Sequence, residues 1–243
     1  MSGGVGPPCD ISLPAEEEAE FKEKNDSSSS KNQNQKAAGY FSFRQLNSLA
    51  VIIILSASGM VGFEDFAFVF FSNIYIYFLS KVAFPSRNPS NEPPVFNPQS
   101  KILRIYVSVG AIIGLFLPIA YIFEGILEGD KEGIKAAAPH VFLLASQIFM
   151  EGVVFSGRYS TPLRAFVPIS YNSSRIFSIM EWLRTEFSKT SADFSGSQRR
   201  FYVGRGLALA NMAFWSFNLF GFLLPVYLPK ALARYYNDNK LKD

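Results

Sequence analysis

Three polar side chains, His140, Gln147 and Glu151, interrupt an otherwise apolar stretch of the sequence. Gln147 and Glu151 follow His140 by seven and eleven residues, so both fall within about 20° of His140 around an α-helix. Ionisable side chains inside a membrane mark the pathways of protons, ions and polar substrates. Together with Asn211 on a later apolar stretch, these residues are therefore the candidate lining of a polar path.

A packing role is the alternative for the same side chains. His140 and Glu151 lie near the two ends of their stretch, where they can reach the membrane interface. Gln147 can hydrogen-bond a neighbouring helix, as amide side chains do within membranes. On this interpretation the three residues hold helices together and conduct nothing.

Small and amide residues elsewhere indicate close helix packing. Asn211 and Asn218 lie seven residues apart on the last apolar stretch and can bond across to another helix. Gly110 and Gly114 form a Gly-x-x-x-Gly pair, which lets a helix approach closely within the bundle or in a dimer. We expect Pro118, one turn later, to kink the same helix.

The composition excludes several kinds of catalytic and binding site. Cys9 is the single cysteine and His140 the single histidine, so one chain holds neither a disulfide nor a Cys/His zinc site. No phosphate-binding glycine loop or nucleophile–base set is present. The net charge of +3 is too small for a nucleic-acid partner. We therefore expect no catalytic residues, no cofactor and no metal, and a protein that is not an enzyme.

Apolar segments long enough for a membrane would position the polar residues. Residues 105–123 contain no charge, and a helix of this length is about as long as a bilayer core is thick. Five apolar segments are expected to form transmembrane helices: 46–62, 66–84, 105–123, 136–156 and 206–228. The predicted fold is all-α, a polytopic membrane helix bundle whose partner is the lipid bilayer. Homo- or hetero-oligomers can form through its transmembrane helices.

A further segment, 163–187, is expected not to span the membrane. Arg175 would lie near the bilayer centre at a cost of about 2.5–3.5 kcal/mol, and its few apolar residues return about 0.3–0.6 kcal/mol each. Ile176, Ile179 and Leu183 fall on one face of its second half. We expect an amphipathic helix on the cytosolic side, either in the membrane interface or packed on the protein itself.

The remaining chain is expected to be short or disordered. Residues 1–39 are acidic and then rich in Ser, Asn and Gln, with too little apolar surface to order them. We therefore divide the chain into a disordered low-complexity tail (1–39), a transmembrane helical domain (40–236) and a short polar C-terminal tail (237–243).

Charges in the connections predict an orientation. Basic connections stay in the cytosol, which places 81–104 and 157–205 there and the acidic connection 124–135 in the lumen. The N-terminus is then cytosolic, in the endoplasmic reticulum or another endomembrane. The basic C-terminus does not fit, because five spans would carry it to the lumen. Either the charge rule fails there, or the last segment bends back at Gly221 and Pro225.

Several segments resemble a family of uncharacterised plant multi-pass transmembrane proteins defined by a domain of unknown function. The segments that carry the resemblance are 43–47 (FRQLN), 55–60 (LSASGM), 110–125 (GAIIGLFLPIAYIFEG), 129–147 (GDKEGIKAAAPHVFLLASQ) and 211–215 (NMAFW). The resemblance covers about residues 40–236 and implies a plant membrane protein, with no catalytic residue or substrate to carry over.

These observations give a first hypothesis and two alternatives. The first is a non-enzymatic membrane protein that acts as a scaffold or assembly factor through helix packing. The alternative is a small channel or transporter whose path is lined by His140, Gln147, Glu151 and Asn211. A membrane-embedded enzyme is the third and the least favoured, because no catalytic set can be assembled by residue type.

Overall fold

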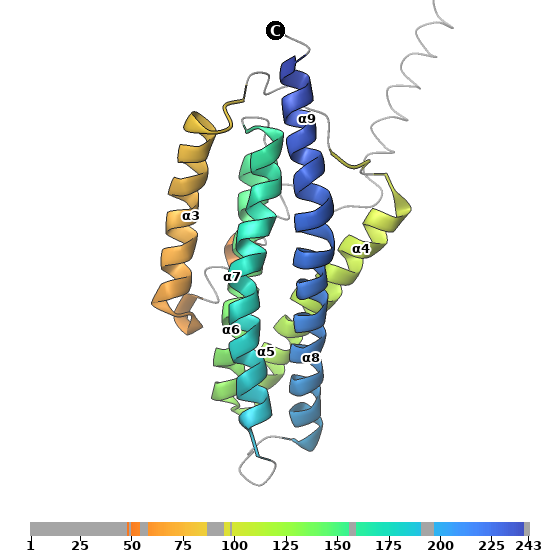
Figure 1. Ribbon diagram of the computed structural model, residues 1–243. Coiled ribbons are helices and arrows are strands. Elements are labelled where there is room, and N and C mark those ends of the chain that lie inside the picture. The colour runs from red at the N-terminus through yellow and green to blue at the C-terminus, as the bar shows by residue number, and fades with distance from the viewer. Residues whose placement is uncertain are drawn as a thin grey trace, which may run out of the picture. The chain divides into compact units, whose positions relative to one another are not determined.

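The computed structural model describes residues 48, 50–53, 58–86, 95–97, 99–155, 159–190 and 197–240. The predicted tail, 1–39, and part of the first apolar segment lie outside these residues. Every regular element among the described residues is a helix, so the all-α fold class is confirmed. Figure 1 shows these helices running alongside one another within the unit formed by Phe43–Asp243.

The helices follow the expected apolar segments but are longer. After a short 3₁₀ turn η1 (Ser58–Met60), the chain forms α3 (Phe63–Val82), α4 (Lys101–Ala111), the π-helical η2 (Ile112–Phe116), α5 (Leu117–Glu128), α6 (Lys131–Phe155), α7 (Thr161–Ser188), α8 (Gln198–Ser216), the π-helical η3 (Phe217–Tyr227) and α9 (Leu228–Lys240). Among the described residues, four helical stretches are long and apolar enough to cross a membrane: Phe63–Val82, Lys101–Glu128, Lys131–Phe155 and Gln198–Asn237.

Burial differs sharply between these stretches. Only 11% of an apolar 18-residue segment of α3 is buried inside the protein, compared with 67% of the corresponding segment of α6. The outer face of α3 exposes Phe70, Phe71 and Tyr77, and that of α5 exposes Phe123 and Leu127. Exposed apolar side chains on this scale need an apolar surrounding. The helices therefore form a bundle with α6 inside and a lipid-compatible surface outside.

The helix over 161–188 is not among the four stretches long and apolar enough to cross a membrane. It packs inside the bundle and not in a membrane interface, which was one of the two positions expected for 163–187. α7 packs along α6 and also against α3, α8, η3 and α9 (Figure 1). Arg175, Ile179 and Trp182 are fully buried on it. The free-energy cost expected for Arg175 near the bilayer centre assumed that its side chain is exposed to lipid. Charged residues within helix bundles instead face the interior and contact partners there.

The last apolar segment does not bend back. α8, η3 and α9 form one continuous helix, and the stretch Gln198–Asn237 has 40 residues. Gly221 and Pro225 lie inside its π-helical part. π-helical turns accommodate an extra residue and a missing N–H without ending a helix.

The connection between α5 and α6 is much shorter than the acidic loop expected at 124–135. Helix α5 ends at Gly129, whose φ of +75° is the left-handed conformation that glycine adopts readily at a helix end. Asp130 then caps α6, because its Oδ1 accepts a hydrogen bond from the Gly133 N–H at 2.9 Å. Pro139 therefore lies inside α6.

Contacts between connections define two ends of the bundle. At one end, which we call the basic end, the Ser160 hydroxyl donates to Phe84 O at 2.8 Å, and the Tyr235 hydroxyl donates to Pro85 O at 3.2 Å. At the other, the acidic end, Ser197 Oγ lies 2.9 Å from Glu128 Oε1. Helix α7 starts after Ser160 and ends at Ser188, so it crosses the full height of the bundle beside α6.

Candidate functional site

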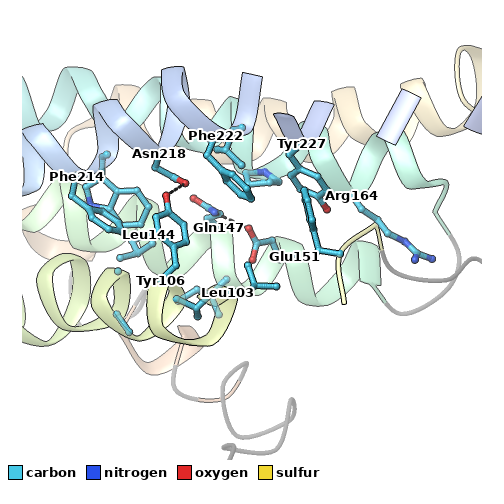
Figure 2. Close-up of a pocket in the computed structure, with 18 of the residues that line it drawn as sticks. Leu103, Tyr106, Leu144, Gln147, Glu151, Arg164, Phe214, Asn218, Phe222 and Tyr227 are labelled. Atoms are coloured by element: carbon cyan, nitrogen blue, oxygen red, sulfur yellow. Dashed lines mark hydrogen bonds between the residues drawn. The ribbon is translucent and has the colours of Figure 1, made fainter. Parts of the chain in front are cut away.

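A cavity of about 450 Å³ lies between α4, α6, α7 and the α8–η3 helix (Figure 2). Its lining is mostly apolar and includes Leu103, Val107, Leu115, Leu144, Phe214 and Phe222. Small-molecule sites are concave, largely apolar and about 300–1,000 Å³ in size, with a few polar groups that fix orientation. The cavity has the size and the lining of such a site.

The polar wall of this cavity comes from α6. Gln147 and Glu151 are one turn apart, and the Gln147 amide donates to Glu151 Oε1 at 2.7 Å. The Gln147 carbonyl oxygen accepts a hydrogen bond from Arg175 on α7. Because arginine can only donate, this contact turns the amide N–H₂ of Gln147 toward Glu151. The carboxylate of Glu151 is thus fixed on the cavity wall by a chain that begins at Arg175.

Among the described residues, Arg175 has no acidic partner within ion-pair distance. Its guanidinium lies 4.0 Å from the centroid of the Trp215 ring, in cation–π geometry. The arginine lies behind Gln147 and Trp215, both of which line the cavity. Glu151 is therefore the acidic side chain on the described cavity wall, and Arg175 lies behind it, joined to it through Gln147.

A second polar contact lies on the cavity wall. The Tyr106 hydroxyl on α4 donates to Asn218 Oδ1 on η3 at 2.6 Å (Figure 2). The Tyr106 ring also stacks on Phe214, with ring centroids 5.5 Å apart. These contacts tie α4 to the α8–η3 helix at the level of the cavity.

Comparison with known proteins identifies the chain at the level of a family. The model of a family described as Domain of unknown function (DUF7733) matches residues 41–236. The chain belongs to the DUF7733 family. No curated protein and no solved structure matches it. The predicted resemblance to a family defined by a domain of unknown function is confirmed to this extent.

Of the four residues proposed for a polar path in this DUF7733 protein, only Gln147 and Glu151 line the cavity. His140 and Asn211 are fully buried. The His140 Nε2 atom lies 2.8 Å from Gly114 O, and the Asn211 amide donates to Ile113 O at 3.0 Å. His140 and Asn211 thus bind two consecutive carbonyls on η2.

The sequence around Pro118 explains why those two carbonyls need donors. The Leu117 N–H donates to Ile112 O, five residues back, so the carbonyl of Ile113 is passed over. Pro118 has no N–H, so the carbonyl of Gly114 lacks the donor that an α-helix would supply. A free carbonyl is costly in a membrane, and neighbouring helices supply the missing hydrogen bonds. The contact also fixes the His140 tautomer, because a carbonyl only accepts and Nε2 must carry the proton.

The glycines proposed for helix packing lie within the bundle. A Cβ atom on Gly114 would meet Trp215 Cζ2 at 2.5 Å, and one on Gly110 would meet Phe214 Cζ at 3.1 Å. Trp215 in turn donates from Nε1 to Asn211 Oδ1 at 3.1 Å. Close approach of α8 to the α4–η2 helix therefore depends on the absence of side chains at these two positions.

A cluster of ion pairs at the acidic end was not predicted from the sequence. Arg200 Nε lies 3.0 Å from Asp130 Oδ2, and Lys189 Nζ lies 2.9 Å from Glu186 Oε1. The Tyr121 hydroxyl donates to the same Glu186 oxygen at 2.7 Å. Arg200 and Glu186 are fully buried. The cluster locks together the ends of α5, α7 and α8.

Asp130 shows how this cluster stabilises its charged state. Burial of the carboxyl raises its pKa, but the N–H of Gly133 and the positive charges of Lys189 and Arg200 lower it by more. The net effect is a pKa below the ordinary value for aspartate. The one sequence signal for this role was an aspartate directly after Gly129, the position of a helix cap.

Proposed function

We propose that this DUF7733 protein is a non-enzymatic, multi-pass membrane protein that binds an apolar or amphiphilic small molecule in the cavity beside Glu151. The observation that carries the proposal is the cavity of about 450 Å³ with one carboxylate, that of Glu151, on a mostly apolar wall. An acidic side chain at membrane depth is costly and marks a functional site by default. A purely structural bundle gains more by filling such a space with side chains.

Binding fits the arrangement better than conduction along α6. The side chains of a continuous polar path must all face the same channel. His140 and Asn211 instead donate hydrogen bonds to carbonyl oxygens of η2. Gln147 and Glu151 remain beside the cavity. The scaffold function is a second candidate, supported by the buried interhelical hydrogen bonds and by the close approach at Gly114.

The orientation is also a proposal. The basic end gathers Lys81, Lys101, Arg104, Lys230 and Arg234, whereas the bases of the acidic end pair with acids such as Asp130 and Glu186. The positive-inside rule then favours a cytosolic basic end. Because α7 runs from one end of the bundle to the other, the C-terminal helix reaches the basic end. The basic C-terminus then lies on the cytosolic side, whereas five spans would have placed it in the lumen.

The location and the partners follow from these arguments. We propose an endomembrane location, such as the endoplasmic reticulum, and a plant origin; the sequence resemblance supports the plant origin. The lipid bilayer is the partner of the exposed apolar faces of α3 and α5. If the first apolar segment also crosses, the N-terminus lies with the basic end in the cytosol. Oligomers through these exposed faces are compatible with the proposal.

Photo-crosslinking tests the binding function. The full chain in lipid nanodiscs is labelled with a diazirine derivative of dodecanol, and the labelled peptides are mapped by mass spectrometry. We expect saturable labelling of the cavity segments 144–155 and 214–227. Ala111→Phe fills the cavity from α4 and should abolish that labelling, whereas Ala120→Phe, on the exposed face of α5, should not. Labelling confined to exposed residues of α3, and equal in both variants, would refute ligand binding.

A further inference from the structure

The cavity has the depth and position of one leaflet of a bilayer. Its wall on α6 runs from Leu144 to Phe155, which corresponds to about 16 Å of helix, and on α4 and η2 from Leu103 to Leu115, about 18 Å. Half of a hydrocarbon core is about 15 Å. Leu144 lies near the middle of α6 and Phe155 at its basic-end terminus. The cavity therefore occupies the half of the bundle that adjoins the basic end.

The acidic side chain of the cavity lies near the basic end. Glu151 is one turn from the end of α6, among apolar residues such as Leu103 and Phe155, and Gln147 lies one turn deeper. Toward the middle of the bundle, the wall includes Leu115, Leu144 and Phe214. A carboxylate near the surface with an apolar wall below it suits the head and the chain of a lipid molecule in this leaflet.

The charge of the polar part selects the head group. Glu151 presents its carboxylate to the cavity, and one of its oxygens is oriented by Gln147 at 2.7 Å. Arg164 also lines the cavity, but its guanidinium is directed away from Glu151 and lies 5.7 Å from the Phe155 ring (Figure 2). A carboxylate in an apolar surrounding attracts a cation or a hydrogen-bond donor strongly.

We infer that the cavity takes a single-chain amphiphile with a protonated amine head, drawn from the leaflet at the basic end, with the amine on Glu151 and the chain pointing toward Leu115 and Leu144. This inference rests on the proposed binding function and names the ligand class for it. Exchange with the leaflet requires no crossing of the midplane, because head and chain already have the orientation of that leaflet.

Competition against the dodecanol photoprobe tests the head group separately from binding. Dodecylamine, dodecanol and dodecanoic acid share one chain and differ only in the head, so differences in competition report the polar contact. In the native protein dodecylamine should compete about tenfold or more better than dodecanol, as expected for a charge-assisted hydrogen bond. Dodecanoic acid should compete less well than dodecanol, because Glu151 repels it.

Variants at Glu151 assign the preference to one side chain. Glu151→Gln should remove the advantage of dodecylamine while dodecanol competes as before, which also shows that the variant is folded. Glu151→Asp keeps the charge and should keep the preference for the amine. Glu132→Gln, an exposed acid at the other end of α6, is the matched control and should change nothing.

Each outcome of the competition decides between the two proposals. Equal competition by the three compounds, or a preference for dodecanoic acid, overturns the amine head while leaving ligand binding intact. An amine preference that persists in a folded Glu151→Gln protein also overturns it. Failure of all three compounds to compete with the photoprobe overturns the binding function itself. If Glu151→Gln does not fold, the comparison in the native protein together with Glu151→Asp still decides.

Discussion

Replacing His140 tests whether the polar residues on α6 serve the backbone of η2. In His140→Phe the ring is kept between Trp182 and Trp215, whose centroids lie 6.0 and 6.3 Å away, but the donor to Gly114 O is lost. An unsatisfied buried carbonyl costs about 1–3 kcal/mol. Measured hydrogen bonds within membranes fall near the lower part of that range, at about 0.6–1.7 kcal/mol. We expect His140→Phe to lower the free energy of unfolding by about 1–2 kcal/mol.

The cause of this loss can be isolated with Pro118→Ala. The new N–H at position 118 can donate to one of the two carbonyls that His140 and Asn211 now satisfy. In the Pro118→Ala background, the cost of either His140→Phe or Asn211→Leu should therefore fall by about 1 kcal/mol, which is a coupling energy typical of residues that share a partner. Unrelated residues would show additive effects.

The assay is unfolding by sodium dodecyl sulfate in mixed micelles. Trp182 and Trp215 are the two tryptophans of the chain, and both lie beside His140, so intrinsic fluorescence reports directly on this part of the bundle. Circular dichroism in parallel gives loss of helix. The reasoning is refuted if both double variants are additive within about 0.3 kcal/mol.

Three further predictions concern packing, pH and topology. Gly114→Ala should destabilise the protein by about 1–3 kcal/mol, because its Cβ would lie 2.5 Å from Trp215. Gly206→Ala, which has open space around it, should stabilise the protein by about 0.4–1 kcal/mol. Equal effects of the two variants on the free energy of unfolding would contradict the close approach at Gly114. Because the folded-state pKa of Asp130 is lowered, the stabilisation of the fold by its carboxylate is present above about pH 4 and is lost as pH falls through the folded-state pKa. Asp130→Asn should therefore lower the free energy of unfolding by about 1–3 kcal/mol at pH 7. A stability difference between this variant and the native protein that does not shrink on acidification would refute this. Glycosylation tags inserted after Gly129 and after Thr190 should be modified, and tags after Ser86 and at the C-terminus should not; opposite modification at 129 and 190 would show that α7 does not cross.

Apolar length alone located most of the bundle. The uncharged run at 105–123 and the segments at 66–84, 136–156 and 206–228 all appear in helices, because an apolar stretch of this length has few other stable arrangements in a membrane. The ends were less accurate, since the bounds of helices depend on caps such as Gly129 and Asp130. Local residues of this kind shift a helix end by several positions.

The burial of the helix over 161–188 was missed for a different reason. The cost of Arg175 was taken from a scale for single helices, which treats every side chain as exposed to lipid. In the bundle, Arg175 binds Gln147 and lies over Trp215, so its partners are on other helices that the sequence does not order in space. One hint was available, because Ile179 and Trp182 make an apolar face beside that charge.

The candidate site was predictable only in its residue types. The spacing of Gln147 and Glu151 on one helix face placed them together, as the structure does. That His140 and Asn211 bind the backbone of η2 depends on a π-helical turn before Pro118, which hydropathy does not reveal. The contact of Tyr106 with Asn218 joins residues far apart in the chain and has no sequence signal.

Native mass spectrometry of the full chain, released from nanodiscs of cellular lipid, tests the cavity most directly. The native protein and Ala120→Phe should each retain one bound small molecule, at a stoichiometry of about one per chain. Ala111→Phe, which fills the cavity, should retain none while remaining folded by circular dichroism. Equal retention in all three proteins, or no retained molecule in the native protein, would contradict the assignment of the cavity as a binding site.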